Sequence, residues 1–338
     1  MTDSNRVVVA WLAIVCATVF AMIVVGGVTR LTESGLSMVD WRPIMGIVPP
    51  TSDEEWQSAF EAYQQYPQYM QVNRDMDLSG FKRIFYWEYG HRVLGRVIGI
   101  VFFVPFILLW WCGKIEPRLI RPLGVALALG GAQGLLGWYM VKSGLIDIPR
   151  VSHYRLAAHL LLAMLIFAYL YWLILSILEV RREAVSKHFR NFVFLLAGLT
   201  TVQLLYGAFT AGIRAGYGYN TFPLMNGQWI ADAVFFMQPW WINLFESGAT
   251  IQFVHRWIGT LLLCLSFGGW ILGRRYPSRV RWASAGLFGT LLVQYAIGVL
   301  TLVQVVPIGL ASLHQAFACA VILALVYLVY VTLPDRAT

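Results

Sequence analysis

The chain has 338 residues, of which 59% are hydrophobic and 12% are charged, and its mean hydropathy is +0.65. A soluble domain of this size does not need so much apolar surface, so the composition excludes an ordinary soluble globular protein. The net charge of +8 comes largely from short basic loops between apolar stretches. This pattern is a signal of membrane topology, and no nucleic-acid partner is expected.

Apolar stretches that are long enough to span a bilayer recur along the whole chain. In chain order they lie at 7–29, 85–112, 120–141, 155–179, 190–213, 249–272, 282–305 and 311–333. No clear small-residue cleavage site follows the first stretch, so we interpret it as a retained helix and not as a signal peptide. The sequence therefore predicts an all-α integral membrane protein with eight transmembrane helices.

Basic residues in the loops predict the orientation of these helices. The short loops at 113–121, 181–190 and 273–281 are rich in lysine and arginine, whereas the connection at 306–310 has neither. Cytoplasmic loops carry the excess of positive charge in membrane proteins. We therefore expect both termini on the cytoplasmic side of the inner (cytoplasmic) membrane.

Two long loops, at 31–84 and 214–248, are then expected on the outer side. The polar, tyrosine-rich stretch at 54–71 predicts one short amphipathic helix near the membrane interface. The aromatic residues of the second loop indicate either an interfacial belt or a cover over the mouth of a site. The four cysteines lie outside both loops and lack CxxC spacing, so no disulfide is expected.

The chain contains an internal two-fold pattern. A glutamine followed four residues later by a glycine recurs in the third, fifth and seventh predicted helices, as Gln133 and Gly137, Gln203 and Gly207, and Gln294 and Gly298. Each half holds four predicted helices, and because this number is even, the two copies share one orientation in a parallel repeat. We expect two pseudo-symmetric four-helix bundles, at 1–180 and 188–335.

Four histidines lie inside predicted helices, His91 and His159 in the first half and His255 and His314 in the second. An ionisable group in lipid is costly and usually functional. With about 1.5 Å of rise per residue, all four are expected within roughly 10 Å of the outer helix ends. Two imidazoles on facing helices can ligate a haem iron from both sides, so the pattern predicts two haem or metal sites. Each histidine taken alone has a simpler alternative, a hydrogen-bonded packing residue.

An arginine follows one histidine of each pair. Arg92 and Arg256 both lie near the outer end of an apolar helix, where a guanidinium needs a partner. Haem propionates are candidate partners because guanidinium binds carboxylate in a bidentate fork. The alternative is that both side chains snorkel to lipid headgroups.

The two halves differ three residues before the first histidine of each pair. Glu88 precedes His91, whereas Gln252 precedes His255. A separation of three places both groups on one helix face, so only the first site has a carboxylate beside it. A carboxylate can take protons during an oxidation, which favours Glu88 as a catalytic group and the second half as an electron-transfer site. The alternative for Glu88 is an interfacial carboxylate paired with Arg92.

Six motifs resemble the heme A synthase family, in the family's order and on the expected helices. They are GGVTRLTESGLS at 26–37, WEYGHRVLGRVIG at 87–99, AAHL around His159, YNTFPLMNGQW at 219–229, FVHRWIG at 253–259 and LHQAF at 313–317. The resemblance covers nearly the whole chain and is to the mitochondrial and alphaproteobacterial branch. Another branch has a cysteine pair in the first outer loop, which this chain lacks, so a thiol-linked role there does not carry over.

The resemblance implies an oxidoreductase that converts haem O to haem A through two hydroxylations of the C8 methyl group and loss of water to leave a formyl group. It implies that His91 and His159 hold the substrate haem, that His255 and His314 hold a haem b cofactor, and that Glu88 occupies the essential acidic position. It also implies a role in cytochrome oxidase assembly. Membrane lipid then surrounds the chain, and haem O synthase or assembly factors are candidate protein partners; the oligomeric state stays open.

Two other functions fit the same residues. A dihaem b-type electron-transfer membrane protein would use both histidine pairs without chemistry on a haem. A transporter would use the histidines as proton relays inside a repeated bundle and would hold no haem. The haems extracted from the purified protein distinguish the three functions.

Overall fold

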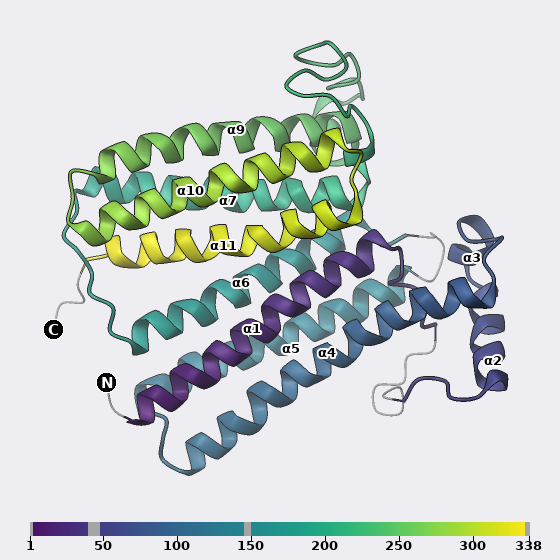
Figure 1. Cartoon of the computed structure of the whole chain (residues 1–338), viewed down its shortest axis with the longest axis horizontal. Helices are drawn as coiled ribbons and strands as arrows, with labels where there is room; N and C mark the ends of the chain where they lie inside the picture. The colour runs from purple at the N-terminus through teal and green to yellow at the C-terminus, as the bar shows by residue number, and fades with distance from the viewer. Residues whose placement is uncertain (1–2, 40–47, 145–149, 335–338) are drawn as a thin grey trace. The chain divides into compact units, whose positions relative to one another are not determined.

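The computed structural model describes residues 3–39, 48–144 and 150–334. Within these ranges the chain is helical, without a β-strand, and carries one isolated bridge between Met225 and Gln228. Eight helices are long and apolar enough to cross a membrane. They are α1 (Asp3–Leu31), α4 (Leu78–Trp111), α5 (Pro117–Gly144), α6 (His153–Ile177), α7 (Lys187–Gly212), α9 (Gly248–Gly273), α10 (Ser278–Val303) and α11 (Ile308–Thr332) (Figure 1). The eight predicted spans are confirmed, and the chain is a multi-pass membrane protein.

The second span begins earlier than the hydropathy pattern predicts. Asp77 caps α4, since its side chain accepts a hydrogen bond of 2.8 Å from the backbone N–H of Gly80. The added turns carry Lys82 and Arg83, which a search for apolar stretches omits. His91 therefore lies about 20 Å from the first residue of its helix. The expectation that every histidine lies within about 10 Å of a helix start is wrong for this one.

The polar stretch of the first long loop forms two short helices, where the sequence predicts one. They are α2 (Asp53–Gln64) and α3 (Pro67–Gln71). Pro67 cannot continue α2 because it lacks a backbone N–H, and it forces Tyr66 into an extended conformation with φ −98° and ψ 153°. Residues 40–47 of this loop lie outside the described residues.

Aromatic packing joins α2 to the extra turns of α4. Trp56 meets Phe85 with ring centroids 5.0 Å apart, and Tyr63 stacks on Phe81 at 5.2 Å. Burial raises the pKa of Tyr63 to about 12, so its hydroxyl stays a neutral hydrogen-bonding group. That hydroxyl donates to Gln68, whose amide in turn donates to the carbonyl of Glu33. These contacts hold the chain just after α1.

The remaining short elements lie in the second long loop. They are η2 (Ala215–Tyr217), η3 (Trp240–Ile242) and α8 (Asn243–Glu246). Several aromatic side chains of this loop are largely exposed, among them Trp229, Phe236 and Trp240. Phe222 is also exposed, at 38%, and its ring meets Tyr295 of α10 at 6.0 Å between ring centroids. The belt and the cover over a site both stay predictions for this loop.

Two compact units make up the chain. One comprises residues 14–159, and the other comprises 1–13 with 160–338. In the first unit, α1 packs on α4 where Met22 meets Gly95, α4 contacts α5, and α5 contacts the beginning of α6. The predicted halves at 1–180 and 188–335 concern an internal repeat, and their status as separate domains stays a prediction.

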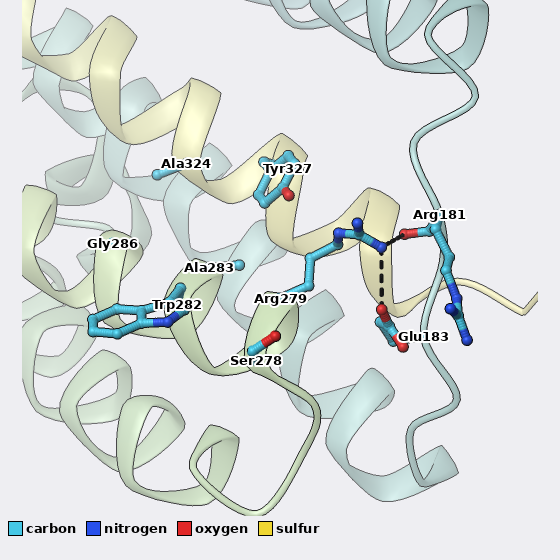
Figure 2. Close-up of a pocket in the computed structure, with 9 residues that line it drawn as sticks. All are labelled: Arg181, Glu183, Ser278, Arg279, Trp282, Ala283, Gly286, Ala324 and Tyr327. Atoms are coloured by element: carbon cyan, nitrogen blue, oxygen red, sulfur yellow. Dashed lines mark hydrogen bonds and ion pairs between the residues drawn. The ribbon is translucent and has the colours of Figure 1, made fainter.

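The second unit contains a bundle of α7, α9, α10 and α11, in which neighbouring helices run side by side (Figure 1). At the end of the bundle where α10 begins, a cavity of about 660 Å³ is lined by Arg181, Glu183, Ser278, Arg279, Trp282, Ala283, Gly286, Ala324 and Tyr327. Arg279 crosses this cavity and donates to the Glu183 carboxylate at 3.1 Å and to the Arg181 carbonyl at 3.2 Å (Figure 2). Ala324 follows His314 by ten residues, about 15 Å along α11, so the cavity is remote from His314.

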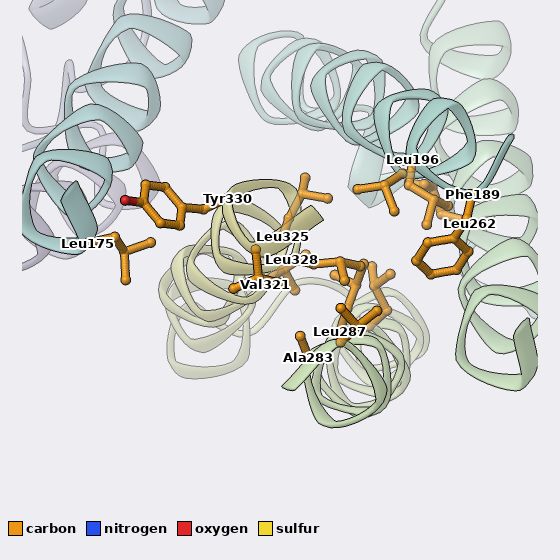
Figure 3. Close-up of a cluster of buried hydrophobic side chains, with 14 residues drawn as sticks. Leu175, Phe189, Leu196, Leu262, Ala283, Leu287, Val321, Leu325, Leu328 and Tyr330 are labelled. Atoms are coloured by element: carbon orange, nitrogen blue, oxygen red, sulfur yellow. The ribbon is translucent and has the colours of Figure 1, made fainter. Parts of the chain in front are cut away.

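The core of this bundle is aliphatic. Leu196, Leu262, Leu287 and Leu325 each come from a different helix and are almost fully buried in one cluster (Figure 3). The helices approach closely where side chains are small: a Cβ added to Gly269 of α9 would lie 3.0 Å from Phe192 of α7. Small residues have this role in membrane bundles because lipid offers no hydrophobic drive for helix association.

Candidate histidine sites

His255 and His314 face each other across the second unit, from α9 and α11. Their ring centroids are 6.5 Å apart and their planes are nearly perpendicular, at 84°. Two imidazole nitrogens bonded at about 2 Å to opposite sides of one metal ion put the ring centroids roughly 6 Å apart. The spacing of this pair therefore fits two axial ligands of a single iron.

His91 and His159 belong to the first unit, on α4 and α6. His91 packs on α1, where a Cβ added to Gly26 would lie 3.2 Å from its Nε2 atom. His159 packs on α5, where a Cβ added to Gly137 would lie 3.0 Å from its Cε1 atom. The structure thus brings His255 and His314 together, and it packs His91 and His159 each against a glycine of a neighbouring helix.

A glutamine and a glycine on a neighbouring helix hold three of these histidines, and we call each such set a clamp. The glutamine amide donates to the histidine backbone carbonyl, at 3.1 Å for Gln133 and His159, 3.0 Å for Gln203 and His255, and 3.0 Å for Gln294 and His314. The glycine one turn later leaves room for the imidazole, since an added Cβ would lie 2.8–3.1 Å from its Cε1 atom at Gly137, Gly207 and Gly298. The sequence shows the glutamine–glycine pattern. It does not show that these residues contact the histidines, which lie on neighbouring helices.

The two ring nitrogens of a clamped histidine differ in their surroundings: the Nε2 atoms of His159 and His314 lie 3.4 Å from the side-chain amide nitrogens of Gln133 and Gln294. The Nδ1 atoms of His159, His255 and His314 are buried without a hydrogen-bond partner among the described residues. Over the same residues, no three histidine, cysteine or acidic side chains converge on one point. Each pair therefore offers two ligands, the number of axial positions that a haem iron leaves open to a protein. The donor set fits a haem.

Glu88 is buried, with 2% of its surface exposed, and both carboxylate oxygens are occupied. Oε2 accepts from the backbone N–H and hydroxyl of Ser37, both at 2.7 Å, and from the backbone N–H of Met38 at 2.8 Å. Oε1 accepts from Arg92, at 2.5 Å and 3.1 Å. The ion pair named as the alternative for Glu88 is thus present, and the same carboxylate also holds the loop after α1 beside His91.

Gln252 takes the same place in the second unit, also with 2% of its surface exposed. Its amide donates to the carbonyls of Ala215 at 2.9 Å and Gly218 at 2.6 Å, and its own carbonyl accepts from Arg256 at 3.3 Å. The loop after α1 therefore presents N–H groups to the Glu88 carboxylate, whereas the loop after α7 presents carbonyl groups to the Gln252 amide. The Glu/Gln difference matches the polarity of the loop that each residue holds.

Both arginines lie beside these two residues and bind loop carbonyls. Arg92 donates to Met38 at 3.0 Å, and Arg256 donates to Thr221 at 2.8 Å and to Tyr219. These bonds account for part of each guanidinium's hydrogen-bonding capacity without a lipid headgroup. Their role toward haem propionates stays a prediction.

Sequence reasoning missed Ser37, because its contact with Glu88 spans 51 positions along the chain.

Comparison with known proteins places the chain among membrane enzymes. A family model described as cytochrome oxidase assembly protein matches residues 9–326. A heme A synthase of Nitrosospira multiformis is 47% identical over 324 residues, which cover 93% of this chain and 90% of that protein. The heme A synthases of Sinorhizobium fredii and Parvibaculum lavamentivorans are 45% and 46% identical, over 95% of this chain in both cases and over 89% and 93% of their own lengths.

The polarity match at Gln252 predicts the effect of a conservative change. Gln252→Glu removes the two N–H donors and leaves the carbonyls of Ala215 and Gly218 facing a carboxylate. We expect the free energy of unfolding to fall by about 2 kcal/mol, measured by denaturant unfolding in detergent. Gln238→Glu, in an exposed part of the same loop, is the control and should leave stability unchanged. Equal unfolding midpoints for the two variants would contradict the role of Gln252.

Proposed function

This chain belongs to the heme A synthase family of cytochrome oxidase assembly proteins and is an oxidoreductase, and from this premise we propose that it converts haem O to haem A. The two histidine pairs in apolar bundles are the observation that supports this function. They provide one place for a substrate haem and one for a second, resident haem. We further propose that the basic loops lie in the cytoplasm together with both termini.

We assign His91 and His159 to the substrate haem and His255 and His314 to a haem b cofactor. The resident haem b would supply one-electron chemistry when bound. The assignment is supported by the buried carboxylate, since the described part of the chain places Glu88 on the helix of His91 and an amide at the matching place beside His255. Of these two matched positions, the one in the first site carries a group that can change its charge during an oxidation, and the one in the second site does not.

Glu88 would accept protons released from the substrate methyl group. Each of the two hydroxylations adds an oxygen atom from water to the methyl carbon and releases two protons and two electrons. The electrons pass to an external acceptor. Loss of water from the resulting geminal diol leaves the formyl group. The Glu88 carboxylate would accept a proton at Oε1 or Oε2 in exchange for one of its present donors, and Arg92 would limit this transfer while it stays paired. The donors of Ser37 and Met38 hold the Glu88 carboxylate in place.

Analysis of the extracted haems tests this function against its two rivals. The protein is purified from cells that make haem O, and its haems are separated by chromatography after a pyridine haemochrome spectrum. Haem O or haem A beside haem B is the expected result. Haem B alone would instead indicate a dihaem electron-transfer protein, and a colourless protein would indicate a transporter.

Glu88→Gln tests the catalytic carboxylate. A glutamine oxygen can still accept from Ser37 and Met38, so we expect both haems to stay bound. Aldehyde formation should fall at least about a hundredfold, the usual contribution of a general acid–base group. Haem A per protein is measured in cells, with the exposed Glu61→Gln as control. Normal haem A production by Glu88→Gln would rule out the role assigned to Glu88.

Two glycines of α10 test the ligand role of His314. A Cβ at Gly298 would lie 2.8 Å from the imidazole, whereas a Cβ at Gly289 would meet nothing within 4 Å. Gly298→Ala should displace the ring and weaken haem b binding roughly tenfold, since overpacking costs about 1–3 kcal/mol. The readout is haem B per protein after gel filtration. If Gly298→Ala and Gly289→Ala retain equal amounts, His314 does not hold this haem.

A further inference from the structure

One of the four histidines lacks the clamp that holds the other three. His91 has the glycine of the clamp, Gly26 on α1, but the residue one turn earlier is Met22. A methionine side chain has no hydrogen to donate, so Met22 cannot bond the backbone carbonyl of His91. The contacts between α1 and α4 at this turn are therefore dispersion contacts.

Met22 and Gln203 occupy equivalent places in the two units. Gln203 lies beside the residue four positions after His255, where a Cβ on Gly259 would be 3.0 Å from the amide nitrogen. Met22 lies beside the residue four positions after His91, where a Cβ on Gly95 would be 3.2 Å from the methyl carbon. A glutamine at position 22 would therefore lie where its amide could donate to the His91 backbone carbonyl, as the Gln203 amide donates to that of His255.

The imidazole of His91 also lies differently from the other three. The clamped rings of His159, His255 and His314 turn their Cε1 atoms toward the glycine. His91 turns its Nε2 and Cδ2 atoms toward Gly26, at 3.2 Å and 3.5 Å from an added Cβ. The ring without a clamp is thus also the ring in a different orientation, although its glycine is retained.

A clamp affects how readily an axial ligand can leave an iron. The ligand leaves by rotation of its ring or by movement of its helix, and a hydrogen bond from the neighbouring helix to the histidine backbone opposes the second motion. Interhelical hydrogen bonds of this kind contribute modestly in membranes. The second site has a clamp on both histidines, whereas the first has one on His159 alone.

We propose that Met22 is a positioning residue that makes His91 the exchangeable ligand of the substrate haem. His159 then stays in place while a haem enters or leaves, and the double clamp of His255 and His314 keeps the cofactor haem resident. This inference rests on the proposed function. It adds a physical reason why one haem turns over and the other does not.

Exchange of the residues at positions 22 and 203 tests the proposal. The full-length protein carrying both haems is mixed with excess apomyoglobin, and the loss of haem O plus haem A and the loss of haem B are followed separately by chromatography. Met22→Gln should slow release of the substrate haem roughly threefold to fivefold, the factor for one interhelical hydrogen bond. Gln203→Met should speed release of haem B by a similar factor.

Met22→Leu is the matched control, since it keeps the apolar volume and adds no donor. It should release the substrate haem at the wild-type rate. In Met22→Gln the rate of haem B release serves as an internal measure of folding and should not change. A glutamine at position 22 would leave its Oε1 atom without a hydrogen-bond partner. The protein tolerates this, because among the described residues the Oε1 atoms of Gln133, Gln203 and Gln294 are also buried without a partner.

Two results would overturn the proposal. One is an unchanged release of substrate haem from Met22→Gln while haem B release stays normal. The other is equal slowing by Met22→Gln and Met22→Leu, which would assign the effect to packing. A wild-type protein with no haem O or haem A would contradict the proposed function itself, and the same chromatography detects this before any variant is compared.

Discussion

The hydrogen bond from a glutamine amide to a histidine backbone carbonyl, beside a glycine one turn away, is the interaction on which the histidine sites depend. Helices in lipid gain no hydrophobic drive toward each other, so close approach and interhelical polar contacts determine their spacing. The glycine permits the approach, and the amide fixes the turn of helix that carries the imidazole. Three of the four histidines are held this way, and His255 and His314 reach a spacing that suits one iron between them.

A second constraint joins the outer loops to the helices that carry the sites. Glu88 accepts from a loop that presents N–H groups, and Gln252 donates to a loop that presents carbonyls. An arginine one turn later supports each residue by binding a further loop carbonyl. Buried polar groups in a low dielectric must be paired, so each side chain is matched to its loop. The carboxylate beside the proposed substrate haem is thus also a structural anchor.

Much of this architecture could be predicted from the sequence. The eight spans follow from hydropathy because every backbone polar group inside a bilayer must bond within its own helix. The prediction was wrong at the start of α4, where Asp77 and turns bearing Lys82 and Arg83 extend the helix. It was also wrong at Pro67, which divides one expected helix into two. The four histidines and their pairing could be found from the repeat, because helical sequence places them at corresponding turns.

The sequence by itself determined the helices, the histidines and the small residues beside them, since these depend on composition and on spacing within single helices. Only the tertiary structure decided what Gln133, Gln203, Gln294 and Met22 touch, and that Glu88 holds Ser37. Those contacts join segments up to about seventy positions apart, and their existence depends on how helices pack and which way each side chain turns. Spacing along the sequence determines neither the packing of the helices nor the orientation of the side chains. The difference between His91 and the other histidines is therefore visible only in the tertiary structure.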